Sequence, residues 1–383
     1  MDFEFSDEEQ VFADLVRRYA RERLLGDYQR WDRGERYPRD RMKELAELGI
    51  TGIRVPHEFG GSQSSYVMAG IAAEELGRGD HNVTLFLQID AIAADIISNH
   101  ACDRVKQEWL PGLASGERLI AFGLTEPDCG SDAGAIRATA KRSGEHWMIS
   151  GEKASITFAG MADACIVFAR SDVGGSEGIG AFLVPLDHPG VSRRVYESAG
   201  ERLTERGSLI FDNAEIPLDY ELGEPGSGFS QAMAAFDYNR AIIALCCIGA
   251  AQQSLDETME YAKKRHTFGK PLAKREGVSF QIAEHLTMLE AARLLAYRCL
   301  FLADRGKSHT KEAAMAKWLG PKAAVEAIHC CIILNGWMGY DRELPHEQRL
   351  RDVIGLEIGD GTPEIMKGVI AREVFGKEFV SYR

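Results

Sequence analysis

The chain has 383 residues with 45% hydrophobic and 27% charged side chains, a balance that excludes a disordered, collagen-like or coiled-coil protein. Its 45 basic and 58 acidic side chains give a formal net charge of −13, whereas nucleic-acid-binding proteins carry a basic excess. No segment approaches the roughly 20 apolar residues that span a bilayer, and residues 1–10 lack the features of a signal peptide. We therefore expect a cytoplasmic protein that neither binds nucleic acid nor inserts into a membrane.

Residues 1–115 are predicted to form a helical domain. Ser6 and Glu9 have the spacing of a helix-capping box, and apolar residues recur behind them at helical intervals. Further helices are expected over residues 69–76 and 91–97, where apolar side chains are dense.

Residues 116–230 have the pattern of a β domain, because short apolar runs such as ACIVFAR and IGAFLVPL are separated by Gly, Asp, Asn and Pro. Residues 231–383 are predicted to be helical again, with long amphipathic stretches over 241–262 and 280–302. Strands and helices do not alternate, so a Rossmann-like sheet is excluded. The expected fold class is α+β, with three domains in the order α, β, α.

The eight cysteines are expected to be reduced thiols, as is usual in a long cytosolic chain. None forms a CxxC pair, and the ten histidines are not spaced with cysteines or carboxylates as metal ligands are. We therefore predict no metal site.

Three segments carry residue types suited to a bound ligand. In the segment 124–132 (LTEPDCGSD), Gly130 lets a flat ligand approach the backbone, and Thr125 and Ser131 offer hydrogen-bond donors. An ordinary polar turn explains the same residues, and composition alone favours that simpler interpretation.

The segment 265–270 (RHTFGK) follows a long helical stretch. Arg265 beside backbone amides suits a diphosphate, because a guanidinium gives two parallel donors to phosphate oxygens. The alternative is a helix C-cap with Gly269 in the left-handed conformation, and both interpretations can hold together.

The third segment contains Gly336–Tyr340 and, further on, Gly359–Thr362. Asp360 stands between two glycines, which suits a loop end that presents a carboxylate. A plain turn with Asp at its favoured position is the alternative.

Together, and in this order, the motifs resemble the acyl-CoA dehydrogenase family almost from end to end. The resemblance rests on the runs VPHEFGG, LTEPDCGSD, AFLVPLDHPGV, FDYNR, RHTFGKPL, PHEQRLRD and DGTPEI. It implies an N-terminal helical domain, a central β-barrel-like domain and a C-terminal four-helix bundle. It also implies a homotetramer made of two dimers, FAD bound partly across a dimer, and an electron-transferring flavoprotein as electron acceptor.

The resemblance further implies roles for single residues. Asp360 falls where most members have a catalytic Glu that removes the proton alpha to the thioester, while a hydride leaves the beta carbon for the flavin. The substrate-binding residues are then Ser131, Asp237, Arg240 and Gly361. The FAD-binding residues are Phe122, Leu124, Thr125, Gly130, Ser131, Ile156, Thr157, Arg265, Thr267, Phe268, Gly336, Thr362 and Glu364.

Departures from the family pattern point to an unusual substrate. Asp360 is one methylene shorter than Glu, and Gly359 replaces a bulky residue. Both changes enlarge the cavity over the flavin, so we expect an alicyclic or branched acyl group. Drift in a loop with compensating neighbours is the alternative. Other departures, in predicted FAD contacts, are Ser155, Glu276, Ile333 and Trp337.

Asp90 stands in the apolar run LFLQIDAIAADII, and a carboxylate there costs free energy unless it is paired or functional. The functional hypothesis is a second base that permits 1,4-dehydrogenation of a cyclic enoyl-CoA to a diene. The alternative is that Asp90 pairs with an Arg or faces solvent. Asn239 stands where some members have an alternative Glu base, so that base is absent.

Two other functions use the same fold. Nitroalkane oxidases resemble the family and have an Asp at the position of Asp360, but the CoA-contact residues Ser131, Asp237 and Arg240 are kept here. A non-enzymatic scaffold would require loss of the base and of the flavin contacts, most of which remain.

Overall fold

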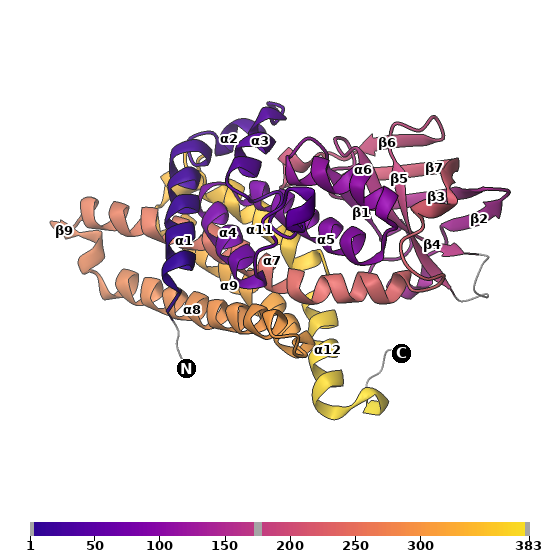
Figure 1. Cartoon of the computed structure of the whole chain (residues 1–383). Coiled ribbons are helices and arrows are strands. Elements are labelled where there is room, and N and C mark those ends of the chain that lie inside the picture. Colours follow the sequence, from indigo (N-terminus) through magenta and orange to yellow (C-terminus); the bar gives the residue numbers. More distant parts are fainter. Residues whose placement is uncertain (1–3, 172–177, 380–383) are drawn as a thin grey trace.

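A computed structural model describes residues 4–171 and 178–379 and shows a helical body, a β body and a second helical body in chain order (Figure 1). Residues 1–3, 172–177 and 380–383, which belong to the three predicted domains, lie outside the described part of the chain.

The N-terminal helices begin at the predicted capping box. The Ser6 hydroxyl accepts the Glu9 N–H, and the Glu9 carboxylate accepts the Ser6 N–H at 2.8 Å. The helices are α1 (Asp7–Tyr19), α2 (Tyr28–Asp32), α3 (Asp40–Glu47), α4 (Tyr66–Gly79), α5 (Thr84–His100) and α6 (Asp103–Ala114). Most residues of α4 and α5 are buried, because these two helices lie inside the molecule and not on its surface.

The middle body is one curled seven-stranded sheet. Its order is β1-β4-β2-β3-β7-β6, with β5 on the free side of β4, and β1 and β2 run parallel to β4. Two register shifts in β3 increase the twist of the sheet. The strands are β1 (Ile120–Gly123), β2 (Thr139–Ser143), β3 (His146–Ile156), β4 (Ala164–Ser171), β5 (Ile179–Pro185), β6 (Val191–Val195) and β7 (Gly207–Pro217).

The C-terminal body is built around three long helices, with α11 and α12 packed against α9. Its elements are α7 (Gly228–Lys264), β8 (His266–Thr267), β9 (Lys270–Pro271), α8 (Glu276–Asp304), α9 (Thr310–Leu334), α10 (Trp337–Tyr340), α11 (His346–Ile358) and α12 (Pro363–Phe375). The alternative that Gly269 caps α7 is wrong. The helix ends at Lys264, and Phe268 and Gly269 form the left-handed turn of the β8–β9 hairpin instead.

Helix α7 is the central element of the fold. It is long and apolar enough to cross a membrane by length and composition, contrary to the sequence expectation, but 83% of the relevant stretch is buried inside the protein. It packs backbone to backbone against α4, because a Cβ added to Gly249 would lie 2.1 Å from the Glu74 carbonyl oxygen. One end of α7 lies against the β body and the other end carries the β8–β9 hairpin (Figure 1).

Candidate active site

The Asp360 carboxylate lies in the loop between α11 and α12 and is held by α7. Its Oδ2 accepts a hydrogen bond from Asn239 Nδ2 at 2.7 Å, and the Arg240 Nε donates to the Asp360 carbonyl at 3.3 Å. The backbone of Asp360 is left-handed, with φ 55°, a conformation that costs free energy in a residue with a Cβ. Thr362 ends the loop, because its hydroxyl caps α12. The loop therefore presents the carboxylate in one fixed place.

Lys317 supports this loop from α9, and sequence reasoning missed it. Its Nζ donates to the Gly361 carbonyl at 2.9 Å and to the Glu357 carbonyl at 3.4 Å. The side chain is buried, and that burial lowers the pKa of Lys317 to about 8. The only sign of this role in the sequence is that Lys317 is the single charged residue in the run AAMAKWLG.

Two of the predicted CoA contacts, Arg240 and Asp237, lie beside the Asp360 loop. Arg240 Nη1 donates to Asp237 Oδ1 at 3.1 Å, and the Arg240 guanidinium lies 5.7 Å from the ring centre of Phe236. Phe236 in turn packs against Phe122 of β1, with ring centres 5.3 Å apart. This row of contacts joins the base to the strand that begins the predicted flavin site.

The loop after β1 is fixed by a buried ion pair. Lys153 Nζ binds Glu126 Oε1 at 2.7 Å and the Leu124 carbonyl at 3.0 Å. The Thr125 carbonyl accepts the Ala154 N–H at 2.9 Å, which ties the loop to the end of β3, where Ile156 and Thr157 stand. The segment 124–132 is therefore a turn that the buried ion pair and the bond to β3 hold in place, which an ordinary polar turn does not require.

The outer part of that turn is open. Gly130 and Ser131 are exposed, and a Cβ added to Gly130 would meet nothing nearer than Thr125 Cγ2 at 3.8 Å. A flat ring can approach the backbone there, so these residues fit a flavin.

The remaining predicted FAD residues fall into two places. Thr362 and Glu364 lie next to Asp360, at the start of α12. Arg265, Thr267 and Phe268 lie on the β8–β9 hairpin, and from Asn239 to Arg265 the helix α7 extends for roughly 40 Å. Gly336 lies at the end of α9, next to Asn335, which donates to Thr258 in the last third of α7. One chain therefore does not bring both sets to a single FAD.

Asp90 is fully buried on α5. Within the described residues, neither of its carboxylate oxygens has a hydrogen-bond partner, and burial raises the pKa of Asp90 well above its usual range. Arg39, the charge that acts on it, donates instead to the Met161 carbonyl and to Asp163. The alternative that Asp90 faces solvent or pairs with an Arg is wrong. Asp90 is not among the α7 residues that contact Asp360. Its role as a second base stays a prediction.

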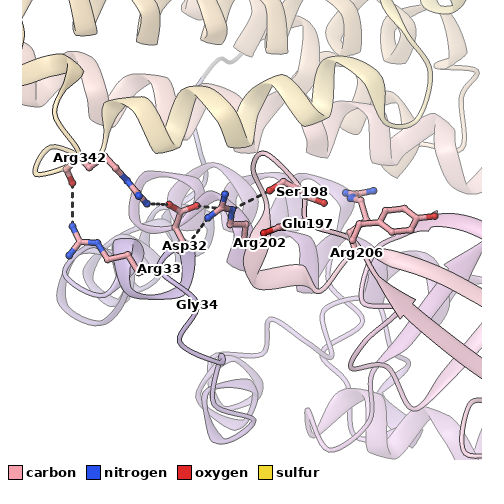
Figure 2. Close-up of a pocket in the computed structure, with 9 residues that line it drawn as sticks. Asp32, Arg33, Gly34, Glu197, Ser198, Arg202, Arg206 and Arg342 are labelled. Carbon is pink, nitrogen blue, oxygen red and sulfur yellow. Dashed lines mark hydrogen bonds and ion pairs between the residues drawn. The ribbon is translucent and has the colours of Figure 1, made fainter.

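A cavity of about 370 Å³ lies elsewhere, between α2, the segment before β7 and the loop after α10 (Figure 2). None of its lining residues is a predicted site residue. Its arginines are engaged within the chain, because Arg342 and Arg202 bind Asp32, and Arg33 donates to the Arg342 carbonyl. The cavity is therefore a contact region between the three bodies. Its lining is Asp32, Arg33, Gly34, Tyr196, Glu197, Ser198, Arg202, Arg206 and Arg342.

Comparison with known families identifies the class of protein. Residues 6–117 match the acyl-CoA dehydrogenase N-terminal domain, residues 121–214 the middle domain and residues 226–375 the C-terminal domain. The chain belongs to the acyl-CoA dehydrogenase family, and it is an acyl-CoA dehydrogenase by its fold and its family.

Individual relatives are similar over nearly the whole chain. The mitochondrial short-chain specific acyl-CoA dehydrogenase of Bos taurus is 37% identical, over 99% of this chain and 92% of the relative. The butyryl-CoA dehydrogenase of Megasphaera elsdenii has a TM-score of 0.94 at 31% identity, covering 98% of this chain and all of the other.

Two further solved structures bear on the cofactor and the partner. A glutaryl-CoA dehydrogenase from Mycobacterium smegmatis, solved in complex with FADH2, has a TM-score of 0.93 at 28% identity, covering 99% of this chain and 97% of the other. A chain from a structure of the electron transferring flavoprotein of Acidaminococcus fermentans has a TM-score of 0.94 at 31% identity, covering 98% and 99%.

Proposed function

We propose that this acyl-CoA dehydrogenase uses Asp360 as the base that removes the alpha proton of an acyl-CoA thioester. The observation that carries the proposal is the fixed carboxylate beside Asn239, Arg240 and Asp237. Because Asn239 occupies Oδ2, Oδ1 is the oxygen that accepts the proton. FAD is the cofactor, and when bound it accepts the hydride that leaves the beta carbon, so that a carbon–carbon double bond forms.

The chain's own residues arrange the substrate. Arg240 and Asp237 lie where the CoA arm would approach the base, and Ser131 offers a hydroxyl from the open turn. We infer that the Asp360 amide donates to the thioester oxygen, where negative charge develops as the alpha proton leaves. Lys317 keeps this amide and the carboxylate in place by binding the two carbonyls of the loop.

The acyl group is proposed to be alicyclic or branched. Gly359 has φ −58° and ψ 150°, which any residue can adopt, and an added Cβ would meet its nearest atom at 3.6 Å. Neither backbone nor packing therefore requires a glycine there, so the missing side chain supports a wider space next to the base. The relatives compared above are named for short straight acyl groups and for glutaryl-CoA, which makes a straight short chain the competing substrate.

A substrate panel tests this proposal. The FAD-loaded protein is mixed anaerobically with cyclohexanecarboxyl-, cyclohexenecarboxyl-, isobutyryl-, butyryl- and octanoyl-CoA, and flavin bleaching is followed. The cyclic thioesters should bleach the flavin fastest, and a faster reaction with butyryl- or octanoyl-CoA would refute the wide-site argument. Fast oxygen use with nitroalkanes, without bleaching by any CoA ester, would instead indicate an oxidase.

A second candidate reaction rests on the buried, unpartnered Asp90. We propose that it accepts a proton from a ring carbon remote from the thioester of a cyclic enoyl-CoA, with the hydride again passing to the flavin. Asp90 must be ionised to do so, and its raised pKa predicts a rate that increases with pH. Asp90→Asn should lose diene formation but keep reaction with saturated substrates. Undiminished diene formation by that variant would exclude the idea.

The oligomer and the electron acceptor are also proposals. The two sets of FAD residues, roughly 40 Å apart along α7, support an FAD site completed by a second chain, as in the homotetramer that we expect. The likeness to a chain from an electron transferring flavoprotein structure supports such a flavoprotein as the acceptor.

A further inference from the structure

A buried cluster of metal-binding side chains lies where the three bodies meet. His81 belongs to the short helical turn between α4 and α5, and Cys246 and Cys247 are consecutive residues of α7. The imidazole and the two thiols are fully buried, and their ligand atoms all lie within 4.8 Å of one another. The spacing of His and Cys along the chain showed no sign of this cluster, because the fold joins residues that lie far apart in the sequence.

The cluster has polar atoms that the protein leaves without partners. Within the described residues, neither ring nitrogen of His81 has a hydrogen bond. Glu201, from the segment before β7, places Oε1 at 3.8 Å from His81 Nε2, within the range of an ion pair, and this oxygen has no hydrogen bond among the described residues. Its other oxygen is held by Arg206 Nη2 at 2.5 Å. Buried polar atoms of this kind are costly unless a ligand satisfies them.

We propose that His81, Cys246 and Cys247 bind one zinc-like divalent cation, and that Glu201, which lies beside His81, turns its free oxygen to supply the fourth donor. Imidazole nitrogen, thiolate sulfur and carboxylate oxygen are the donors of four-coordinate zinc sites, whose donor atoms lie roughly 3.3–3.8 Å apart. The ligand atoms of His81, Cys246 and Cys247 are farther apart than this by at most about 1 Å, which side-chain rotation closes, and Glu201 Oε1 lies 3.8 Å from His81 Nε2. Two thiolates and the Glu201 carboxylate carry three negative charges, one more than a divalent cation neutralises. The positive charge of Arg206, which binds Glu201, balances the third.

The surroundings suit a closed structural site. Gln88 Nε2 donates to Cys246 Sγ at 3.4 Å, as a supporting hydrogen bond to a ligand sulfur does. Arg206, which holds Glu201, also lines the cavity of Figure 2, whereas His81, Cys246, Cys247 and Glu201 are buried behind it and do not line it. With the ion bound, the turn after α4, helix α7 and the segment before β7 are joined at one point. The ion would stabilise the junction of the three bodies and take no part in the chemistry at Asp360.

The metal content of purified protein tests this proposal directly. The FAD-loaded protein is produced with zinc in the medium and purified without chelators, and metals are measured by mass spectrometry. We expect about one zinc ion per chain. Cys246→Ser/Cys247→Ser should lose it, whereas Cys330→Ser/Cys331→Ser, which changes the other adjacent cysteine pair, should keep it. Wild-type protein without metal above the blank, or equal metal in both variants, would overturn the proposal.

A second measurement tests the proposal even if the Cys246→Ser/Cys247→Ser variant does not fold. Wild-type protein produced with cobalt in place of zinc should show a thiolate-to-cobalt charge-transfer band, which the Cys330→Ser/Cys331→Ser variant should retain. A spectrum with flavin bands alone would overturn the proposal. Neither readout depends on activity. Absence of bound metal would therefore not bear on the role of Asp360 as the base, and a result against that role would not bear on the metal site.

Discussion

The placement of the Asp360 carboxylate depends on single side chains around its loop. Lys317 binds two loop carbonyls from a buried position, so Lys317→Met removes both contacts without changing the length of the side chain much. A misplaced base of this kind costs roughly 10- to 100-fold in rate. We expect kcat to fall by about that factor while KM changes little, as measured by steady-state kinetics.

The matched control for that variant is Lys322→Met, on the same helix but at the surface, in an ion pair with Glu326. Its kcat should equal that of the wild type. If both variants lose activity equally, the loop contacts of Lys317 are not the cause.

Part of the site could be read from the sequence and part could not. Asp360, Asp237 and Arg240 were predicted to share one site because their motifs resemble those of a known family, and the structure places them together. Lys317 and the Asn239–Asp360 bond could not be predicted, because pattern alone does not show that a lone cation on an apolar helix points at a loop. His81 and Cys246 were missed for a related reason, since only the tertiary fold brings them together.

At the scale of elements, the contact between α4 and α7 is the tightest helix packing to test. Gly249→Ala should destabilise the protein by about 1–3 kcal/mol, because its Cβ would overlap the Glu74 carbonyl. Gly368→Ala in α12 is the control, since its Cβ would meet no atom within 4 Å and should stabilise by about 0.5–1 kcal/mol. Denaturant unfolding measures both, and equal effects would contradict the close packing.

The elements themselves were largely predictable. Helix periodicity and the capping box located α1, α4 and α5, and short apolar runs located the β body, because these signals are local. The β8–β9 hairpin was not predicted. Two-residue strands carry no periodicity, and Gly269 suits a hairpin turn as well as a helix cap.

At the scale of the whole molecule, the hairpin tip tests the proposed assembly. Phe268 is 96% exposed although it is a predicted FAD contact, and in the assembly that we propose a second chain covers it. Phe268→Asp should yield smaller particles in light scattering and lose FAD. Val195→Asp, a substitution of an exposed residue on β6, should do neither. Wild-type protein that is monomeric with FAD bound would refute the shared site.

The acid stability of the protein should depend on His346. Burial and the nearby Arg349 lower the pKa of this imidazole to about 4. Between pH 6.5 and 4 the unfolded chain therefore binds a proton that the folded chain does not, so stability falls as the pH falls, by up to about 3 kcal/mol. His346→Gln should flatten this part of the curve in unfolding titrations. An unchanged slope would show that His346 is not responsible.

Anaerobic rapid mixing of FAD-loaded protein with its best acyl-CoA tests the role of Asp360 most directly. Wild-type protein, and the surface control Asp341→Asn, should bleach the flavin at the same rate. Asp360→Asn should keep its FAD but bleach about 10²- to 10⁴-fold more slowly, the usual contribution of a general base. Bleaching by Asp360→Asn at the wild-type rate would show that another group removes the alpha proton.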